Sequence, residues 1–271
     1  MQLRTYTPDA PLTSLVDCFW YARGPTGHHA WERVLPTGAM QLVVNLRDDS
    51  VVVTNDSRSN SPTRLSGTVL NGVYTQPLDL DAASRAATVG VSFAPGGAAP
   101  FLDRPASELR NQTVSLETIW GPDGRRLRNR LLDAPTAPEK FRVLEAALHD
   151  QWTGSDASSF VDEAVALVRA HSGILSVEEL VEQTGYSHRH VADRFRARVG
   201  LSPKRFSRVV RFQAALSRAQ NDTVDWPQLA LACGYYDQAD LIRDFRAFAD
   251  LTPTAYRDRA PREKNHVPLS E

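Results

Sequence analysis

The sequence predicts an α+β protein: a β-rich, barrel-like N-terminal domain with flanking helices, then an all-α domain of two helix-turn-helix units joined by a long helix. Three observations predict this class. The first 95 residues contain short runs in which apolar and polar side chains alternate, as in half-buried strands. Beyond residue 97, apolar side chains recur at helical spacing. The twelve residues FRARVGLSPKRF at 195–206 return at 245–256 as FRAFADLTPTAY, with five identities.

The composition is that of a globular protein with room for two domains. The chain has 271 residues, 42% apolar and 23% charged, and a net charge of −1. No N-terminal signal pattern is present and no apolar run is long enough for a membrane helix, so we expect a cytoplasmic protein with no membrane partner. Cys18 and Cys233 lie far apart in apolar surroundings, which is typical of buried thiols in a reducing compartment.

Two runs indicate the N-terminal strands most clearly. ATVGVSF places Val89 and Val91 on one face and Thr88 and Ser92 on the other, and MQLVVNL, at 40–46, alternates in the same way. The rest of this half is predicted to hold a polar loop at 54–66 and helices near 97–102, 123–133 and 138–152.

The segment TGSDASS, at 153–159, is the expected hinge between the halves. We therefore predict one domain over residues 1–152 and a second over 157–260. The last residues, 261–271, are polar and contain two prolines, so they are predicted to be disordered.

The repeat belongs to two helical pairs. In the unit at 176–199, Ser176 and Glu179 form a capping box that opens a short helix, a Gly-Tyr pair makes the turn, and a longer helix follows. The unit at 225–249 has the same order, with Asp225 as the cap. This is the helix-turn-helix pattern, whose second helix lies in the DNA major groove.

A linking helix of about seventeen residues spans roughly 25 Å, and it could hold the reading helices about one DNA turn, ~34 Å, apart. The alternative is an all-helical packing repeat.

These residues resemble the paired helix-turn-helix domain of AraC/XylS-type transcriptional regulators. The resemblance rests on GYSHRHVADRFRARVGLSPKRF in the first unit and ACGYYDQADLIRDFRAFADLTPTAYR in the second. The stretches RVLPTGAMQLVVNL and VGVSFAPGGAAPFLDRPASELRNQTVSLETIW resemble the uncharacterised sensor-like half of one branch of these regulators. The resemblance implies a sequence-specific DNA-binding transcriptional regulator with double-stranded DNA as partner, and RNA polymerase as a further partner if it is an activator.

The resemblance also places DNA contacts on the exposed face of each second helix. Arg189 and Arg243 would read base edges, whereas Arg196, Lys204 and Arg205 would contact phosphates. Asp193 occupies a position at which the best-known regulators of this family have a basic residue that contacts bases. It would repel phosphates unless it is paired with His190 or Arg189. The full predicted set is Ser187, His188, Arg189, Ala192, Asp193, Arg194, Arg196, Lys204, Arg205, Tyr236, Asp237, Gln238, Ala239, Arg243 and Arg246. The predicted core positions are Val191, Phe195, Phe206, Leu241, Phe245 and Tyr256.

Charge divides unevenly between the two units. Residues 187–218 carry nine basic side chains and one acid, whereas residues 219–259 carry four basic and seven acidic ones. Nonspecific affinity comes mostly from phosphate neutralisation, so we expect it to reside in the first unit and the linking helix. Asp240 and Asp244 flank Arg243 and are expected to weaken the second unit's hold on DNA.

No residue set indicates catalysis, a metal or a cofactor. His28 and His29 have no Cys or carboxylate at suitable spacing to complete a metal site, and His188 and His190 cannot chelate together on a helix. No Ser/His/Asp, Cys/His or paired-carboxylate set stands out, so we expect no enzyme activity. The segment APGGAAPF could bind an anion through backbone amides, or it is a simple strand-to-helix turn.

An aromatic and polar set is predicted to line an effector pocket in the N-terminal half, and the same residues also fit a strand-rich core. The set is Trp20, Trp31, Arg33, Tyr74 and Gln76. Two functions therefore stay open: a regulator controlled by a small-molecule effector, or a ligand-independent DNA-binding protein whose N-terminal domain dimerises or contacts another protein. The sequence leaves open the effector, the operator, the target genes, the oligomeric state and whether transcription is activated or repressed.

Overall fold

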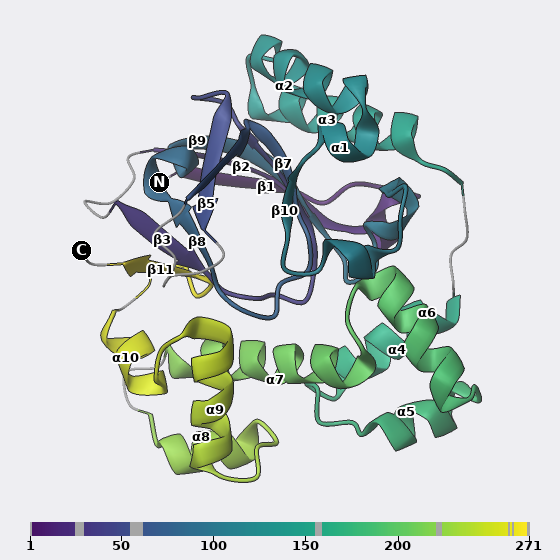
Figure 1. Cartoon of the computed structure of the whole chain (residues 1–271), viewed down its shortest axis with the longest axis vertical. Helices are drawn as coiled ribbons and strands as arrows, with labels where there is room; N and C mark the ends of the chain where they lie inside the picture. Colours follow the sequence, from purple (N-terminus) through teal and green to yellow (C-terminus); the bar gives the residue numbers. More distant parts are fainter. Residues whose placement is uncertain are drawn as a thin grey trace.

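Two antiparallel sheets face each other in the N-terminal half (Figure 1). The computed structural model describes residues 2–24, 30–54, 62–154, 159–220, 224–259, 261 and 263–269. The first sheet has the order β1 (Gln2–Tyr6), β2 (Val16–Arg23), β9 (Ala87–Phe93), β4 (Gln41–Asn45), β7 (Thr68–Asn71) and β10 (Thr113–Ser115). The second has the order β11 (His266–Leu269), β3 (Trp31–Val34), β8 (Leu78–Asp81), β5 (Ser50–Thr54) and β6 (Thr63–Ser66). The α+β class is confirmed, and the barrel-like half consists of two sheets that do not close into one.

Strand register explains which face of the first sheet is buried under helices. Leu42 pairs with Val91 and Val44 with Val89, and all four side chains are fully buried. Their face packs against α2 (Pro122–Asp133) and α3 (Ala137–Gln151). Side chains alternate across a strand, so the opposite face of β4 and β9 is directed to the second sheet.

The remaining helices of this half are short. They are α1 (Glu117–Trp120) and the 3-10 turns η1 (Leu12–Ser14), η2 (Ala82–Arg85), η3 (Ala99–Phe101) and η4 (Ala106–Leu109). The helix expected near 97–102 is only the 3-10 turn η3. Gly97 cannot carry a side chain there, because an added Cβ would lie 2.0 Å from the carbonyl oxygen of Leu15.

The C-terminal half is helical. Its helices are α4 (Ser159–Ala170), α5 (Val177–Thr184), α6 (His188–Val199), α7 (Pro203–Ala219), α8 (Trp226–Ala232), α9 (Gln238–Ala249) and α10 (Pro253–Asp258). The long helix α7 runs beneath the sheets, with α4, α5 and α6 at one end and α8, α9 and α10 at the other (Figure 1). The two halves share one continuous apolar core. The ring of Phe206 on α7 lies against Gly38 so closely that an added Cβ would be 3.0 Å from it. Residues 155–158 of the expected hinge lie outside the described residues.

The expectation of a disordered tail is wrong for residues 266–269. They form β11, which pairs antiparallel with β3 and buries Val267 completely. The two residues just before the strand's first residue are also held by hydrogen bonds: Tyr256 donates to the carbonyl of Lys264, and Gln213 donates to the side chain of Asn265. Pro268 suits an edge strand, where one side of the backbone needs no partner. The polar composition of residues 261–271 does not predict a strand, because only one side chain of β11 is fully buried.

Candidate nucleic-acid interface

The first helical pair forms as its sequence predicts. Ser176 and Glu179 make a reciprocal capping box at the start of α5, which ends at Gly185 in the left-handed region with φ +72°. Ser187 then caps α6 by accepting a hydrogen bond from the backbone N–H of His190. These contacts satisfy backbone groups that an uncapped helix end would leave free, and they fix the angle at which α6 leaves the turn.

The second pair repeats this arrangement. Asp225 caps α8 through the N–H of Gln228, and Gly234 turns the chain with φ +77°. Asp237 caps α9 through the N–H of Asp240. Helix α7 between the pairs has seventeen residues, a length of roughly 25 Å.

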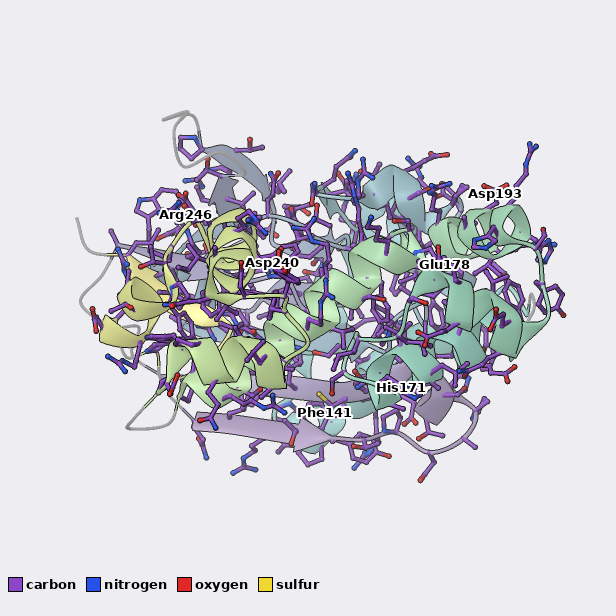
Figure 2. All side chains as sticks on the ribbon, turned by 90° about the horizontal axis from the view of Figure 1, so that it is seen from below. Phe141, His171, Glu178, Asp193, Asp240 and Arg246 are labelled. Atoms are coloured by element: carbon purple, nitrogen blue, oxygen red, sulfur yellow. The ribbon has the colours of Figure 1, made fainter. Side chains whose placement is uncertain are left out.

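Every predicted DNA contact lies at the surface. Fourteen of the fifteen side chains are exposed and Ala192 is half-buried. Tyr236, just before α9, is 88% exposed, which is unusual for a large aromatic residue. The six predicted core positions are all fully buried. Figure 2, seen from the side of the C-terminal helices, shows Asp193 on α6 at one end of this face and Asp240 and Arg246 on α9 at the other.

An exposed ion-pair network covers the middle of α6. A carboxylate oxygen of Asp193 lies 3.7 Å from Nε of Arg189, and the other lies 3.5 Å from a guanidinium nitrogen of Arg196. Asp193 is thus paired with Arg189, one of the two residues that could offset its repulsion of phosphates. Such exposed pairs are weak, typically below ~1 kcal/mol, so DNA phosphates can compete for both arginines.

The two acids flanking Arg243 on α9 have different surroundings. Asp240 is paired with Arg243 at 2.9 Å. Asp244 is only 3% exposed and accepts hydrogen bonds from Arg208 on α7, one of them 3.2 Å from Nε. Asp244 therefore does not lie on the exposed face from which it was expected to weaken DNA binding, because its carboxylate is buried and holds α9 against α7.

The C-terminal end of α9 is fixed to the N-terminal half by Arg33. Its guanidinium makes two bonds to the carboxylate of Asp79, at 2.7 and 2.8 Å, and donates to Ala249 O and the Asp250 carboxylate at 3.2 Å each. Asp250 has φ +54° where the first copy of the repeat has Gly200 at φ +87°. Few residues other than glycine adopt this conformation, and the bond from Arg33 supports it. Arg33 therefore joins the halves, and it does not line the cavity between the two sheets.

A cavity of about 250 Å³ lies between the two sheets, and Trp20 lines it. The other members of the predicted effector set do not. Tyr74 is buried with its hydroxyl 2.7 Å from that of Thr113, while Trp31 and Gln76 are half-buried outside the cavity wall. Sequence reasoning missed most of the wall: Leu3, Thr5, Cys18, Ala22, Val34, Gln41, Val43, Val51, Val53, Val69, Asn71, Leu78, Leu80, Ser84, Arg85, Thr88, Ser92, Glu263 and His266. The signal that could have found it is the small polar face of β9, which faces the cavity with Thr88 and Ser92.

The described residues contain no group of three or more His, Cys, Asp or Glu side chains placed to hold a metal. His28 and His29 lie outside the described residues. Within the described part of the chain, no helix is long and apolar enough to cross a membrane.

Two exposed second helices, one at each end of α7, are the arrangement of a paired helix-turn-helix DNA-binding domain. Comparison with known families agrees: residues 180–259 match a helix-turn-helix domain, and residues 4–115 match a domain of unknown function. The chain therefore carries an AraC-type helix-turn-helix domain at its C-terminal end, behind an N-terminal domain of unknown function.

The chain is also similar to solved structures of other proteins. An apo form of ToxT from Vibrio cholerae is 11% identical, with 90% of this chain and 98% of that chain covered and a TM-score of 0.49. Wild-type ToxT bound to an unsaturated fatty acid is also 11% identical, with 84% and 91% covered and a TM-score of 0.46. The xylose-binding activator XylR is 22% identical over 40% of this chain and only 29% of its own length, with a TM-score of 0.34. No curated protein matches the sequence.

Proposed function

We propose that residues 157–260 bind an operator with α6 and α9 in successive turns of the major groove, and that a small molecule held in residues 1–152 controls this binding. The observation that carries the proposal is the pair of capped, exposed helices at the two ends of α7. Arg189 and Arg243 read bases, and Arg194, Lys204 and Arg205 neutralise phosphates. Among the described residues, none of these last three forms an ion pair, so their charge is available to DNA.

Footprinting on the protein's own and adjacent promoters tests the DNA-binding arrangement. Two protected tracts about 10 base pairs apart, centre to centre, are expected on one face of the duplex. Inserting half a helical turn between the tracts should abolish high-affinity binding, and inserting a full turn should weaken it less. Equal affinity for all three spacings would contradict the rigid, paired arrangement.

The cavity between the sheets supports effector control. It is largely apolar and lined mostly by strand residues of both sheets, as small-molecule sites in proteins are mostly apolar. A thermal-shift screen tests this part, because a ligand that binds only the folded state raises the melting temperature.

Strand β1 favours a second candidate role for the N-terminal half, namely dimerisation. It is an edge strand whose five residues are all exposed, so its outer backbone groups can pair with a second copy. Light scattering separates the two roles: a dimer that Arg4→Pro, a change on β1 outside the cavity wall, disrupts without changing ligand binding would support this second role.

A further inference from the structure

Strands β3 and β8 present different residues to the two faces of the second sheet. Arg33 lies opposite Asp79 in the strand register, and Val34 lies opposite Leu78. Successive side chains of a strand point to opposite faces, so Arg33 and Asp79 share one face of the sheet. The other face belongs to Val34, Leu78 and Leu80, all of which line the cavity. The Arg33–Asp79 pair therefore lies on the side of these strands that faces away from the cavity.

On this outer side, Arg33 holds the C-terminal end of α9. Its Nε and Nη2 atoms bond to the carboxylate of Asp79 at 2.7 and 2.8 Å, and the two residues are only 5% and 4% exposed. Its Nη1 atom donates to the carbonyl oxygen of Ala249 and to the carboxylate of Asp250, each at 3.2 Å. The donors of a guanidinium group lie in one plane at fixed angles. Since two of them are fixed on β8, the third determines where the end of α9 lies relative to the second sheet.

The two reading helices differ in how their C-terminal ends meet the N-terminal half. Helix α6 is followed by Gly200 at φ +87° and α9 by Asp250 at φ +54°. Glycine adopts this left-handed conformation freely, whereas in Asp250 it costs conformational energy, which the bond from Arg33 offsets. Gly200 packs on the backbone of η4, since an added Cβ would lie 3.1 Å from the carbonyl oxygen of Ala106. The end of α9 is held by directed hydrogen bonds from a charged group.

Hydrogen bonds fix α9 at two places along its length. Near the middle of the helix, the buried carboxylate of Asp244 accepts hydrogen bonds from Arg208 of α7. At the end of the helix, Ala249 accepts the bond from Arg33. Two such contacts define the direction of the helix axis, so loss of the second lets α9 turn about the first.

The base-reading group of α9 lies on the other side of Asp244 from Ala249. The guanidinium of Arg243 is 2.9 Å from the carboxylate of Asp240, one turn before Asp244. Ala249 is five residues beyond Asp244, a distance of about 7.5 Å along the helix. The helix therefore acts as a lever, and a shift of its end moves the Arg243 guanidinium in the opposite direction by a comparable amount. A hydrogen bond to a base edge requires a separation of about 3 Å, so such a shift lowers affinity at that base pair.

We propose that Arg33 is a positioning residue for base reading by the second unit: anchored on Asp79, it sets the direction of α9 and so the place at which Arg243 meets its base pair. This rests on the DNA binding and the effector control proposed above. Because β3 and β8 also line the cavity, a ligand that shifts these strands shifts Arg33 and with it α9. The effector thus acts on the second unit, while the first unit keeps its hold on the DNA phosphates.

A paired substitution removes the contact without leaving a buried charge. Arg33→Ala alone would leave the carboxylate of Asp79 unpaired and destabilise the fold, so the test variant is Arg33→Leu/Asp79→Leu, which keeps the net charge. In gel-shift titrations of the full chain it should bind the operator at least roughly fivefold more weakly, the lower end of the loss expected for one base-reading contact. Its affinity for a scrambled duplex should stay within about twofold of the wild-type value, because the phosphate contacts are unchanged. Arg128→Gln is the matched control, since its half-buried guanidinium bonds to the carbonyl of Asn45 within the N-terminal half, and it should change neither affinity.

Combination with changes of the two readers separates positioning from a general loss of stability. Arg243→Ala should cost at most about twofold more in Arg33→Leu/Asp79→Leu, because Arg243 is already misplaced there. Arg189→Ala should cost as much in this variant as it does in the wild-type protein. Equal further losses from both changes would overturn the proposal, as would an unchanged operator affinity in Arg33→Leu/Asp79→Leu. Arg189→Ala and Arg243→Ala alone test the DNA-binding arrangement, so its failure is distinguishable from that of the positioning role.

Asp250→Gly tests the same contact in a variant that should fold without difficulty. Glycine adopts the left-handed conformation, and only the bond from Arg33 to the carboxylate is lost. Operator binding should weaken by about twofold, and this loss should disappear when Arg243→Ala is also present. A loss that persists beside Arg243→Ala would show that the end of α9 does not act through its reader.

Leu80→Phe tests the link to the cavity, because it enlarges a side chain of β8 that lines the wall. It should change operator affinity in the wild-type protein and leave it unchanged in Arg33→Leu/Asp79→Leu. An equal change in both backgrounds would overturn the transmission of effector binding through Arg33.

Discussion

Asp240 and Asp244 are one helical turn apart on α9, yet they perform different tasks. Asp240 pairs on the surface with Arg243, whereas Asp244 is buried against Arg208. The repeat predicts correctly which apolar positions are buried and which positions of α6 and α9 are exposed. It could not predict the partner of Asp244, because Arg208 is 36 residues away and the contact depends on how α9 packs on α7.

Arg189→Ala and Arg243→Ala are each expected to cost about 1–3 kcal/mol at the operator and to relax preference at one base pair. Lys204→Ala, a matched loss of one positive charge, should weaken binding to all sequences alike. Gel-shift titrations against an operator and a scrambled duplex measure both effects. Unchanged operator affinity in both arginine variants would show that the reading faces are placed incorrectly.

The acids of α9 give a second residue-scale prediction. Asp240→Asn releases Arg243 and removes a negative charge near DNA, so it should tighten nonspecific binding and steepen its salt dependence. Asp244→Asn should instead lower the free energy of unfolding by about 1–3 kcal/mol, because it leaves Arg208 without its carboxylate partner. Denaturant titration and salt-dependent binding of both variants make the comparison. An Asp244→Asn variant that binds DNA more tightly and has an unchanged free energy of unfolding would contradict the structural role of the buried carboxylate.

Among the strands, β4 and β9 could be predicted from the sequence, whereas β11 could not. They differ in how many of their side chains are buried and in what holds them in the sheet. The predicted strands β4 and β9 belong to the central part of a sheet and alternate clearly. Strand β11 is an edge strand of four residues, held by one buried side chain and by hydrogen bonds from distant helices. The local sequence shows an alternation of apolar and polar residues, but it does not show hydrogen bonds that come from distant helices. The role of Arg33 in joining the halves could not be predicted for the same reason, since its partners Asp79 and Asp250 belong to remote elements.

Strand β11 should make the protein sensitive to mild acid. The folded protein keeps His266 neutral down to a pKa of about 3, among Arg85, Glu32 and Glu263, whereas the unfolded chain takes up a proton near pH 6.5. Stability is therefore fully present above about pH 6.5 and falls as the pH is lowered, by up to ~1.4 kcal/mol per pH unit from this residue.

Thermal unfolding from pH 7.5 to 5.0 measures this effect. The His266→Asn variant should show a flatter profile across that range, and His171→Asn, a change at an exposed histidine of the helical half, should not. Identical slopes in wild-type protein and His266→Asn would mean that another group controls the acid response.

At the scale of the whole molecule, the halves form one structural unit. The core is continuous through α7, and Gln213 of α7 donates a hydrogen bond to the carbonyl of Pro36 at 2.7 Å. Packing of η4 against the end of α6 adds a second contact region. Composition along the chain suggested separate domains, because the hinge-like segment is visible in sequence while contacts between distant segments are not.

A chain cut between the halves should therefore stay assembled. With a protease site engineered into residues 155–158, the two fragments are expected to co-elute after cleavage in native size-exclusion chromatography and to retain operator binding. A fragment that starts at residue 159 and is expressed alone should be less stable, because the faces of Phe206 and Val209 that meet Gly38 become exposed. Fragments that separate on cleavage would show that the shared core is weak.

The position of β11 in the chain also has a consequence for biosynthesis. The ribosome releases β3 early, but the strand that pairs with it emerges only after the whole helical half, some 230 residues later. At about 5–20 residues per second this delay is roughly ten to fifty seconds. Throughout that interval a nascent chain has an unpaired edge on β3 and an incomplete cavity wall. A regulator assembled in this order acquires its complete pocket only once its DNA-binding part has been synthesised.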